Sequence, residues 1–248
     1  MSKIAQDGNM NIDFSLANED GVTLIEVMVY MVMAGMLLAA AVMAFMGQNK
    51  TYNRQDIIAE IQQNIRSASQ LMASEIRMAG FDPAEKGEVG FVSAAENVLS
   101  FDYWEDTNGN GSYDDETAPR SITYDLYDMY DDGSTDIRRT VGGQEMPLAE
   151  NINRLRFEYM YRKGNAWFWA KDAAAIQAAL SVSADKALEK IRAVKIIVLG
   201  HSRPSAFTVT DSTVYRPPLE GSATQDWTAA ANSGDRRLLS VVVQCRNN

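Results

Sequence analysis

The chain has 248 residues, with 33 acidic and 23 basic side chains and a net charge of −10. This acidity argues against a nucleic-acid partner, because Lys and Arg are what neutralise a phosphate backbone. A single cysteine, Cys245, excludes an intrachain disulfide, and a single histidine, His201, excludes a histidine-rich catalytic metal centre within the chain. The length is sufficient for one sizeable hydrophobic core.

Residues 22–46 form an apolar stretch of 25 residues that contains one charged side chain, Glu26. As a helix rising about 1.5 Å per residue it is about 37 Å long, enough to cross a hydrocarbon core of about 30 Å. A carboxylate at the bilayer centre costs about 2.5 kcal/mol or more, so Glu26 requires a compensating partner. Residues 1–21 are polar, which is unlike an ordinary secretory signal with its basic start and short apolar run.

The helical pattern continues past the apolar stretch into a polar sequence. Apolar residues recur there at steps of three or four: Ile57, Ile61, Ile65, Ala68, Met72, Ile76 and Ala79. The spacing predicts one helix over about residues 23–78, amphipathic in its second half and stopped at Gly80.

Beyond Pro83, short runs rich in aromatic and β-branched residues predict strands. They cover residues 98–104, 121–126, 137–141, 155–161, 167–169, 191–199 and 238–244. Residues 163–165 predict a hairpin turn, residues 172–180 a short helix capped by Asp172, and residues 202–235 a long surface loop. Alternation along the aromatic triplet at 167–169 would bury Phe168 or both tryptophans, so core packing is expected, and the alternative is an exposed contact patch. The fold class is therefore α+β, with a long N-terminal helix packed on an antiparallel β-sheet domain.

The segment from Asp106 to Glu116 has the spacing of a calcium-binding loop. Oxygen-bearing side chains stand at its positions 1, 3 and 5, followed by Gly111 at position 6. The expected ligands are Asp106, Asn108, Asn110, Ser112 (through its backbone carbonyl), Asp114 and Glu116. Hard oxygen ligands favour Ca²⁺ over transition metals.

This loop departs from an EF-hand, because position 12 is Thr117 and no helix clearly flanks it. A calcium loop between strands fits better, and the alternative is an Asn-Gly turn in an acidic surface loop. A second acidic turn over residues 128–136 lacks regular ligand spacing and is expected to be a solvated loop.

The sequence shows no catalytic motif, since it lacks a nucleophile elbow, a phosphate-binding glycine loop and a His-Glu-x-x-His pair. His201 is expected to be a surface histidine at a strand end. Cys245 is expected to be a buried structural thiol, because no histidine is near it in sequence. These features predict a protein that is not an enzyme.

Gly21 followed by Val-Thr-Leu-Ile-Glu at 22–26 resembles the processing site of type IV prepilins. The resemblance implies cleavage after Gly21 by a prepilin peptidase and N-methylation of the new N-terminus at Val22. It also implies that Glu26 pairs with the terminal amine of a neighbouring subunit. Val22 stands where the family usually has an aromatic residue, and residues 19–20 are acidic where leaders are often basic.

The helix end at residues 75–83 resembles that of PilW-like minor pilins, and so does the order of the segments at 151–159, 191–196 and 236–247. The resemblance implies a pilin fold in four parts: a prepilin leader at 1–21, a transmembrane or filament-core half-helix at 22–46, an amphipathic half-helix at 47–80, and a globular β-rich pilin domain at 81–248.

The function implied is that of a minor pilin, a structural subunit of a type IV pilus that acts in assembly initiation or in the tip complex. Its expected partners are other pilins and minor pilins, the prepilin peptidase and the inner membrane, with no nucleic acid. The domain would be periplasmic before assembly and extracellular in the pilus afterwards. Two alternatives remain: a minor pseudopilin of a type II secretion system, or a membrane-anchored periplasmic module that binds or senses cations.

Overall fold

The computed structural model describes residues 21–87, 89–113, 118–131, 134–202, 213–218, 220, 227–228 and 234–246. The chain divides into two units, residues 1–52 and residues 53–248. Apart from Gly21, the expected leader lies outside the described residues.

Helix α1 spans Leu24–Ile76, as the spacing of apolar residues predicts. Side chains 21–56 are all exposed, whereas one face of the later turns is buried. The buried residues of the helix are Ile61, Ile65, Ala68, Ser69, Met72, Ala73 and Ile76. A turn follows the helix, in which Gly80 has a φ of 73° and donates its N–H to the Asp102 carbonyl oxygen at 3.0 Å. Glycine adopts this left-handed conformation without strain, so Gly80 ends the helical segment as predicted.

Five strands form an antiparallel sheet in sequence order: β1 (Gly90–Ala94), β2 (Leu99–Tyr103), β3 (Arg120–Tyr127), β4 (Asp136–Val141) and β5 (Gln144–Ala149). Alternation along β2 buries Leu99, Phe101 and Tyr103. The predictions for β2, β3 and β4 are confirmed. The edge strands β1 and β5 were not predicted, because β1 has only Phe91 and Val92 as aromatic or β-branched residues, and β5 is mostly exposed and contains Pro147.

A second antiparallel sheet has the order β11-β8-β6-β7. Its strands are β6 (Ile152–Lys163), β7 (Ala166–Ala170), β8 (Ile191–His201) and β11 (Arg236–Gln244). Nearly every side chain of the central strand β8 is buried, as expected when both faces of a strand are covered. These four strands and the hairpin turn between β6 and β7 agree with the prediction, although β6 is longer at both ends.

Two short helices, α2 (Ala173–Leu180) and α3 (Ala184–Leu188), lie between β7 and β8 in the chain. Asp172 caps α2 as predicted, with its Oδ1 accepting the Ala175 N–H at 2.7 Å. Helix α3 has only five residues, too few for a periodic signal. The predicted loop at 202–235 contains the two-residue strands β9 (Val214–Tyr215) and β10 (Trp227–Thr228), and most of the rest of it lies outside the described residues.

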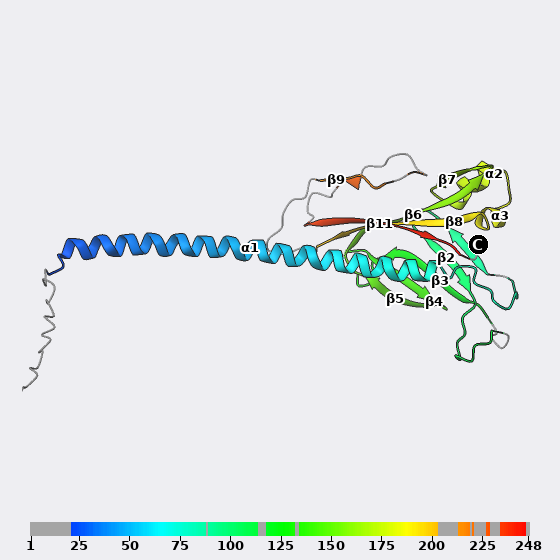
Figure 1. Ribbon diagram of the computed structural model, residues 1–248, viewed down its shortest axis with the longest axis horizontal. Coiled ribbons are helices and arrows are strands. Elements are labelled where there is room, and N and C mark those ends of the chain that lie inside the picture. Colours follow the sequence, from blue (N-terminus) through cyan, green and yellow to red (C-terminus); the bar gives the residue numbers. More distant parts are fainter. Residues whose placement is uncertain are drawn as a thin grey trace, which may run out of the picture. The chain divides into compact units, whose positions relative to one another are not determined.

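The later part of α1 packs with both sheets around one core (Figure 1). Glu75 of α1 joins the helix to the five-stranded sheet through an ion pair and a hydrogen bond. The Arg139 guanidinium makes a bidentate ion pair with the Glu75 carboxylate, and the Tyr124 hydroxyl donates to the same carboxylate. Burial, followed by the hydrogen bond to Glu75, raises the pKa of Tyr124, which therefore stays protonated as the donor.

Glu75→Ala is expected to lower the free energy of unfolding by about 3 kcal/mol, because it removes the anion that faces a largely buried arginine and tyrosine. Urea denaturation followed by tryptophan fluorescence measures the change. Glu60→Ala is the matched control, because this carboxylate on the same helix is exposed and makes no ion pair among the described residues. A loss for Glu75→Ala no greater than that of the control would contradict the role of this contact.

Candidate functional site

The start of α1 lies immediately after the expected processing site. Thr23 precedes the helix, and its Oγ1 accepts the Glu26 N–H at 3.3 Å. The Thr23 carbonyl oxygen accepts the N–H groups of Glu26 and Val27 at 3.1 and 3.2 Å. These are the contacts of an N-cap threonine, so the helix begins at Leu24, two residues after Val22. A chain cut after Gly21 would carry its new amine within about one helical turn of Glu26.

The Glu26 side chain has one hydrogen-bond partner in the part of the chain that the structure describes. Tyr30, one turn further along α1, donates its hydroxyl to Glu26 Oε1 at 3.0 Å. The next Lys or Arg along the chain is Lys50, well beyond the three or four residues over which helical side chains meet. A tyrosine hydroxyl is neutral, so it supplies a hydrogen bond without compensating the charge.

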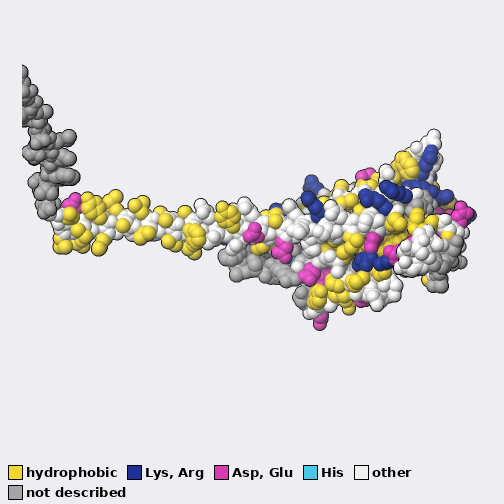
Figure 2. Space-filling view, turned by 60° about the horizontal axis from the view of Figure 1, so that its bottom comes forward, with side chains coloured by type: hydrophobic (Ala, Val, Ile, Leu, Met, Phe, Trp, Pro, Cys, Tyr) yellow, Lys and Arg dark blue, Asp and Glu magenta, His cyan; other side chains and the backbone are white. Residues whose placement is uncertain are grey.

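The surface around Glu26 is apolar. The large hydrophobic side chains between Val22 and Met46 are exposed, and Figure 2 shows them along the first part of α1. By length and composition α1 is the one described helix that is able to cross a membrane. An exposed apolar helix of this kind is stable only in lipid or packed against other apolar helices. The segment therefore combines an apolar surface with one carboxylate near its start.

The acidic loop after β2 is built around Asp106. Its Oδ1 accepts the N–H groups of Gly109 and Asn110 at 2.7 and 3.2 Å, and its Oδ2 accepts that of Gly111 at 2.8 Å. Asn108 Oδ1 accepts the Asn110 N–H at 2.9 Å. Both glycines have positive φ values, 72° and 77°, which this tight curl requires.

Asp106 Oδ1 and Asn108 Oδ1 therefore lie against the same N–H group, that of Asn110, while Asn110 Oδ1 accepts the Ser112 N–H at 2.6 Å. The other two predicted ligands, Asp114 and Glu116, lie outside the described residues. Among the described residues no group of three or more His, Cys, Asp or Glu side chains is placed to hold a metal ion. The second acidic turn also falls partly outside them, at residues 132–133.

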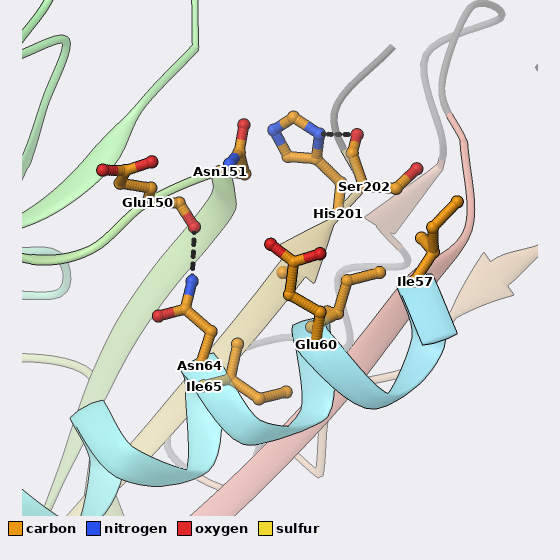
Figure 3. Close-up of a pocket in the computed structure, with 10 residues that line it drawn as sticks. Ile57, Glu60, Asn64, Ile65, Glu150, Asn151, His201 and Ser202 are labelled. Atoms are coloured by element: carbon orange, nitrogen blue, oxygen red, sulfur yellow. Dashed lines mark hydrogen bonds between the residues drawn. The ribbon is translucent and has the colours of Figure 1, made fainter. Parts of the chain in front are cut away.

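His201 ends β8 and lines a pocket of about 130 Å³ that the sequence did not indicate. Figure 3 shows Glu60 and Asn64 of α1 on one side of it and Glu150, Asn151 and His201 on the other. The His201 ring contacts the Ser202 carbonyl oxygen at 2.9 Å and Ser134 Oγ at 3.3 Å. Both ring nitrogens therefore have partners within the fold, which favours a structural role for this histidine.

Helix α1 approaches β8 closely at Gly200, which also lines the pocket. A Cβ atom on this residue would lie 2.7 Å from Ile65 Cγ2 and 3.1 Å from Ile61 Cγ2. Glycine therefore lets the helix lie directly on the strand at that point. Asn64 Nδ2 donates to the Glu150 carbonyl oxygen at 2.8 Å and joins the helix to the turn between β5 and β6 (Figure 3).

Two further sequence predictions have different outcomes. Burial raises the pKa of the Cys245 thiol to about 12, so the thiol is protonated at neutral pH, although the residue is only partly buried where a buried thiol was expected. The expectation that the aromatic triplet packs in the core is wrong for two of its members. Trp167 is 54% exposed and Phe168 43%, because β7 is the last strand of its sheet.

Comparison with known proteins identifies the N-terminal segment. Residues 16–42 match the family model described as the prokaryotic N-terminal methylation motif. No curated protein matches the chain. Among solved structures, the chain is similar to the type IV-like pilin TTHA1219 from Thermus thermophilus, at 14% sequence identity and a TM-score of 0.44, over 75% of this chain and 95% of that one.

The methylation motif begins before the apolar half of α1, and the later half of the same helix packs with antiparallel sheets. By length and composition, the apolar half of this helix is suited to anchorage in a membrane. The chain therefore carries a prokaryotic N-terminal methylation motif at the start of a long helix whose later half packs with antiparallel sheets.

Proposed function

We propose that this protein is a minor pilin, a structural subunit that acts in the initiation of type IV pilus assembly or in the tip complex of the pilus. The observation that carries the proposal is Glu26, the one charge on an exposed apolar helix segment, three residues after the N-cap that follows the methylation site. Its intramolecular partner is a neutral hydroxyl, which leaves the charge to be compensated by another molecule.

The mechanism of assembly follows from these residues. The prepilin peptidase cuts after Gly21, and Val22 becomes the methylated N-terminus. Before assembly, the subunit is anchored in the bacterial inner membrane with residues 81–248 in the periplasm. Apolar helix packing then drives bundling, while the Glu26 carboxylate meets a neighbour's amine and sets the axial stagger. The pair is strong because it forms in an apolar, low-dielectric environment.

A minor pseudopilin of a type II secretion system has the same parts, and gene neighbourhood separates the two. A membrane-anchored cation-binding or sensing module is distinguished by its leader, which it would keep.

Processing is tested by mass spectrometry of the protein purified from membranes of its native host. The expected mature chain begins at N-methylated Val22. Gly21→Val is expected to leave the precursor uncut, because the residue on the leader side of the cut is altered. An intact Met1, or a cut elsewhere, would refute the minor-pilin proposal.

We also propose that the loop at 106–116 binds calcium, which orders the connection between β2 and β3. The supporting features are the ligand spacing, the positive φ values of Gly109 and Gly111, and the approach of the Asp106 and Asn108 oxygens to one N–H group. Asp114 and Glu116 would complete the ligand set.

Calcium is expected to raise the melting temperature of the wild-type protein, because a ligand at about 100 times its Kd stabilises by about 2.7 kcal/mol. Asp106→Ala is expected to abolish this rise. Differential scanning calorimetry with calcium and with a chelator measures it, and Asp128→Ala in the second acidic turn should keep the full response. Identical melting curves of the wild-type protein in calcium and in chelator would contradict the proposal that the loop binds calcium.

A further inference from the structure

Strand β7 is an edge strand whose outer side has no partner strand among the described residues. Lys163 pairs with Ala166 across a two-residue turn, and Tyr161 pairs with Phe168. In such a hairpin these pairs exchange backbone hydrogen bonds, and the residues between them turn their N–H and C=O groups outward. Trp167 and Trp169 therefore present two donors and two acceptors along the open edge.

Aromatic side chains stand on both faces of this edge. Trp167 and Phe168 alternate across the strand and are 54% and 43% exposed. The Arg162 guanidinium lies 5.9 Å from the centroid of the Trp167 ring, and the Phe168 ring lies 5.9 Å from that of Tyr161. A strand added beside β7 would place side chains on both faces of the sheet and would therefore contact both the Trp167 and the Phe168 ring. Successive nucleic-acid bases, by contrast, stack along one face.

Proteins usually protect an edge strand with a proline or with charged side chains. The edge strand β5 of the other sheet contains Pro147. Strand β7 has neither a proline nor a charge, since its sequence is Ala-Trp-Phe-Trp-Ala. The combination of open backbone groups and exposed aromatic rings is the surface that β-strand addition requires.

The charges beside this edge select the partner. Residues 162–192 contain six Lys or Arg and three Asp or Glu, although the whole chain has a net charge of −10. Arg162, Lys163 and Lys171 flank the edge and are exposed, while Asp172 is occupied as the cap of α2. Figure 2 shows basic and hydrophobic side chains next to each other near this end of the domain. Two copies of β7 would bring like charges together, which argues against self-pairing.

We propose that β7 is a docking edge for an extended, carboxylate-bearing segment of another protein, which adds to the sheet as a further strand. The inference goes beyond filament assembly through α1, because it concerns a different surface, on residues 162–171.

The test uses the full-length protein in detergent micelles and two probe peptides of about ten residues, the length of a long strand. One peptide alternates glutamate with valine, and the other alternates lysine with valine. The acidic peptide is expected to bind at least about tenfold more tightly than the basic one. It should also slow hydrogen exchange at the amides of Trp167 and Trp169, because these groups become hydrogen-bonded to the added strand.

Variants distinguish the contribution of backbone hydrogen bonds to peptide binding from that of the side chains. Trp167→Pro removes an outward N–H without breaking the β6–β7 ladder, and it is expected to weaken binding at least about tenfold. Trp167→Ala keeps the N–H and should weaken binding less. The double variant Lys163→Glu/Lys171→Glu is expected to weaken binding of the acidic peptide, whereas Lys50→Glu on α1 should leave this binding unchanged. Thermal melting verifies that each variant is folded.

Four results would overturn the proposal. They are absence of binding by the acidic peptide, equal binding of both peptides, protection at a strand other than β7, and self-association of the protein through β7. None of these measurements depends on filament formation, so they leave the proposed role in the pilus to its own test.

Discussion

Glu26→Ala is expected to leave the protein in the inner membrane and to reduce its incorporation into filaments by more than about tenfold. Truncating one partner of a buried charge pair costs about 2–5 kcal/mol, and about 1.4 kcal/mol corresponds to a factor of ten. Membrane insertion should persist, because the substitution removes the least favourable side chain of the segment. Cell fractionation measures insertion, and immunoblotting of sheared filaments measures incorporation.

Two variants control for other effects of this change. Tyr30→Phe removes the hydroxyl that donates to Glu26 Oε1 and keeps the carboxylate, so incorporation should stay close to that of the wild type. Glu60→Ala removes an exposed carboxylate from a later turn of the same helix and should also be neutral for incorporation. Normal filament incorporation of Glu26→Ala would show that the carboxylate does not dock a neighbouring subunit.

Lys195→Met is expected to lower the free energy of unfolding by about 3–5 kcal/mol, the cost of removing one partner of a buried ion pair. Lys195 lies on β8 opposite Glu158 of β6, and both are buried. The Lys195 ammonium lies 3.4 Å from Glu158 Oε2 and 2.8 Å from Glu220 Oε1, and it donates to the Pro218 carbonyl oxygen at 2.9 Å. Methionine keeps the aliphatic stem and removes the cation.

The same ammonium group holds the segment after β9 against the sheet. The Glu220 N–H donates to both Glu158 oxygens, at 3.2 and 3.1 Å, and Lys195 Nζ lies 4.3 Å from the centroid of the Trp169 ring. Losing the ammonium leaves a fully buried carboxylate without its nearest cation, and the Glu220 side chain loses the same contact. Urea denaturation followed by tryptophan fluorescence measures the loss of stability.

A double variant distinguishes charge from packing. Lys195→Met/Glu158→Leu removes both charges and should be more stable than Lys195→Met alone, because apolar residues often replace a buried ion pair at little cost. Lys163→Met, an exposed lysine near the end of β6, should change stability by less than about 0.5 kcal/mol. A loss below about 1 kcal/mol for Lys195→Met would show that the pair is not fully desolvated.

Local patterns in the sequence were sufficient for the elements with strong periodicity. Ile61, Ile65, Met72 and Ile76 repeat at helical spacing, so the buried face of α1 was predictable from residue order alone. The central strand β8 was predictable because a strand covered on both faces must be apolar almost throughout. Asp172 marked the start of α2 because a carboxylate satisfies free N–H groups at a helix N-terminus.

Other features depend on contacts between residues far apart in the chain. Glu158 and Lys195 resemble surface charges in the sequence, and only the pairing of β6 with β8 brings them together. The alternation over residues 167–169 is typical of a core strand, but the place of β7 at the sheet edge leaves Trp167 and Phe168 exposed. The sequence by itself determined the N-terminal motif, the helix and the main strands, because each depends on neighbouring residues. Only the tertiary structure decided which charges are buried and which edge is open, because both depend on strand order.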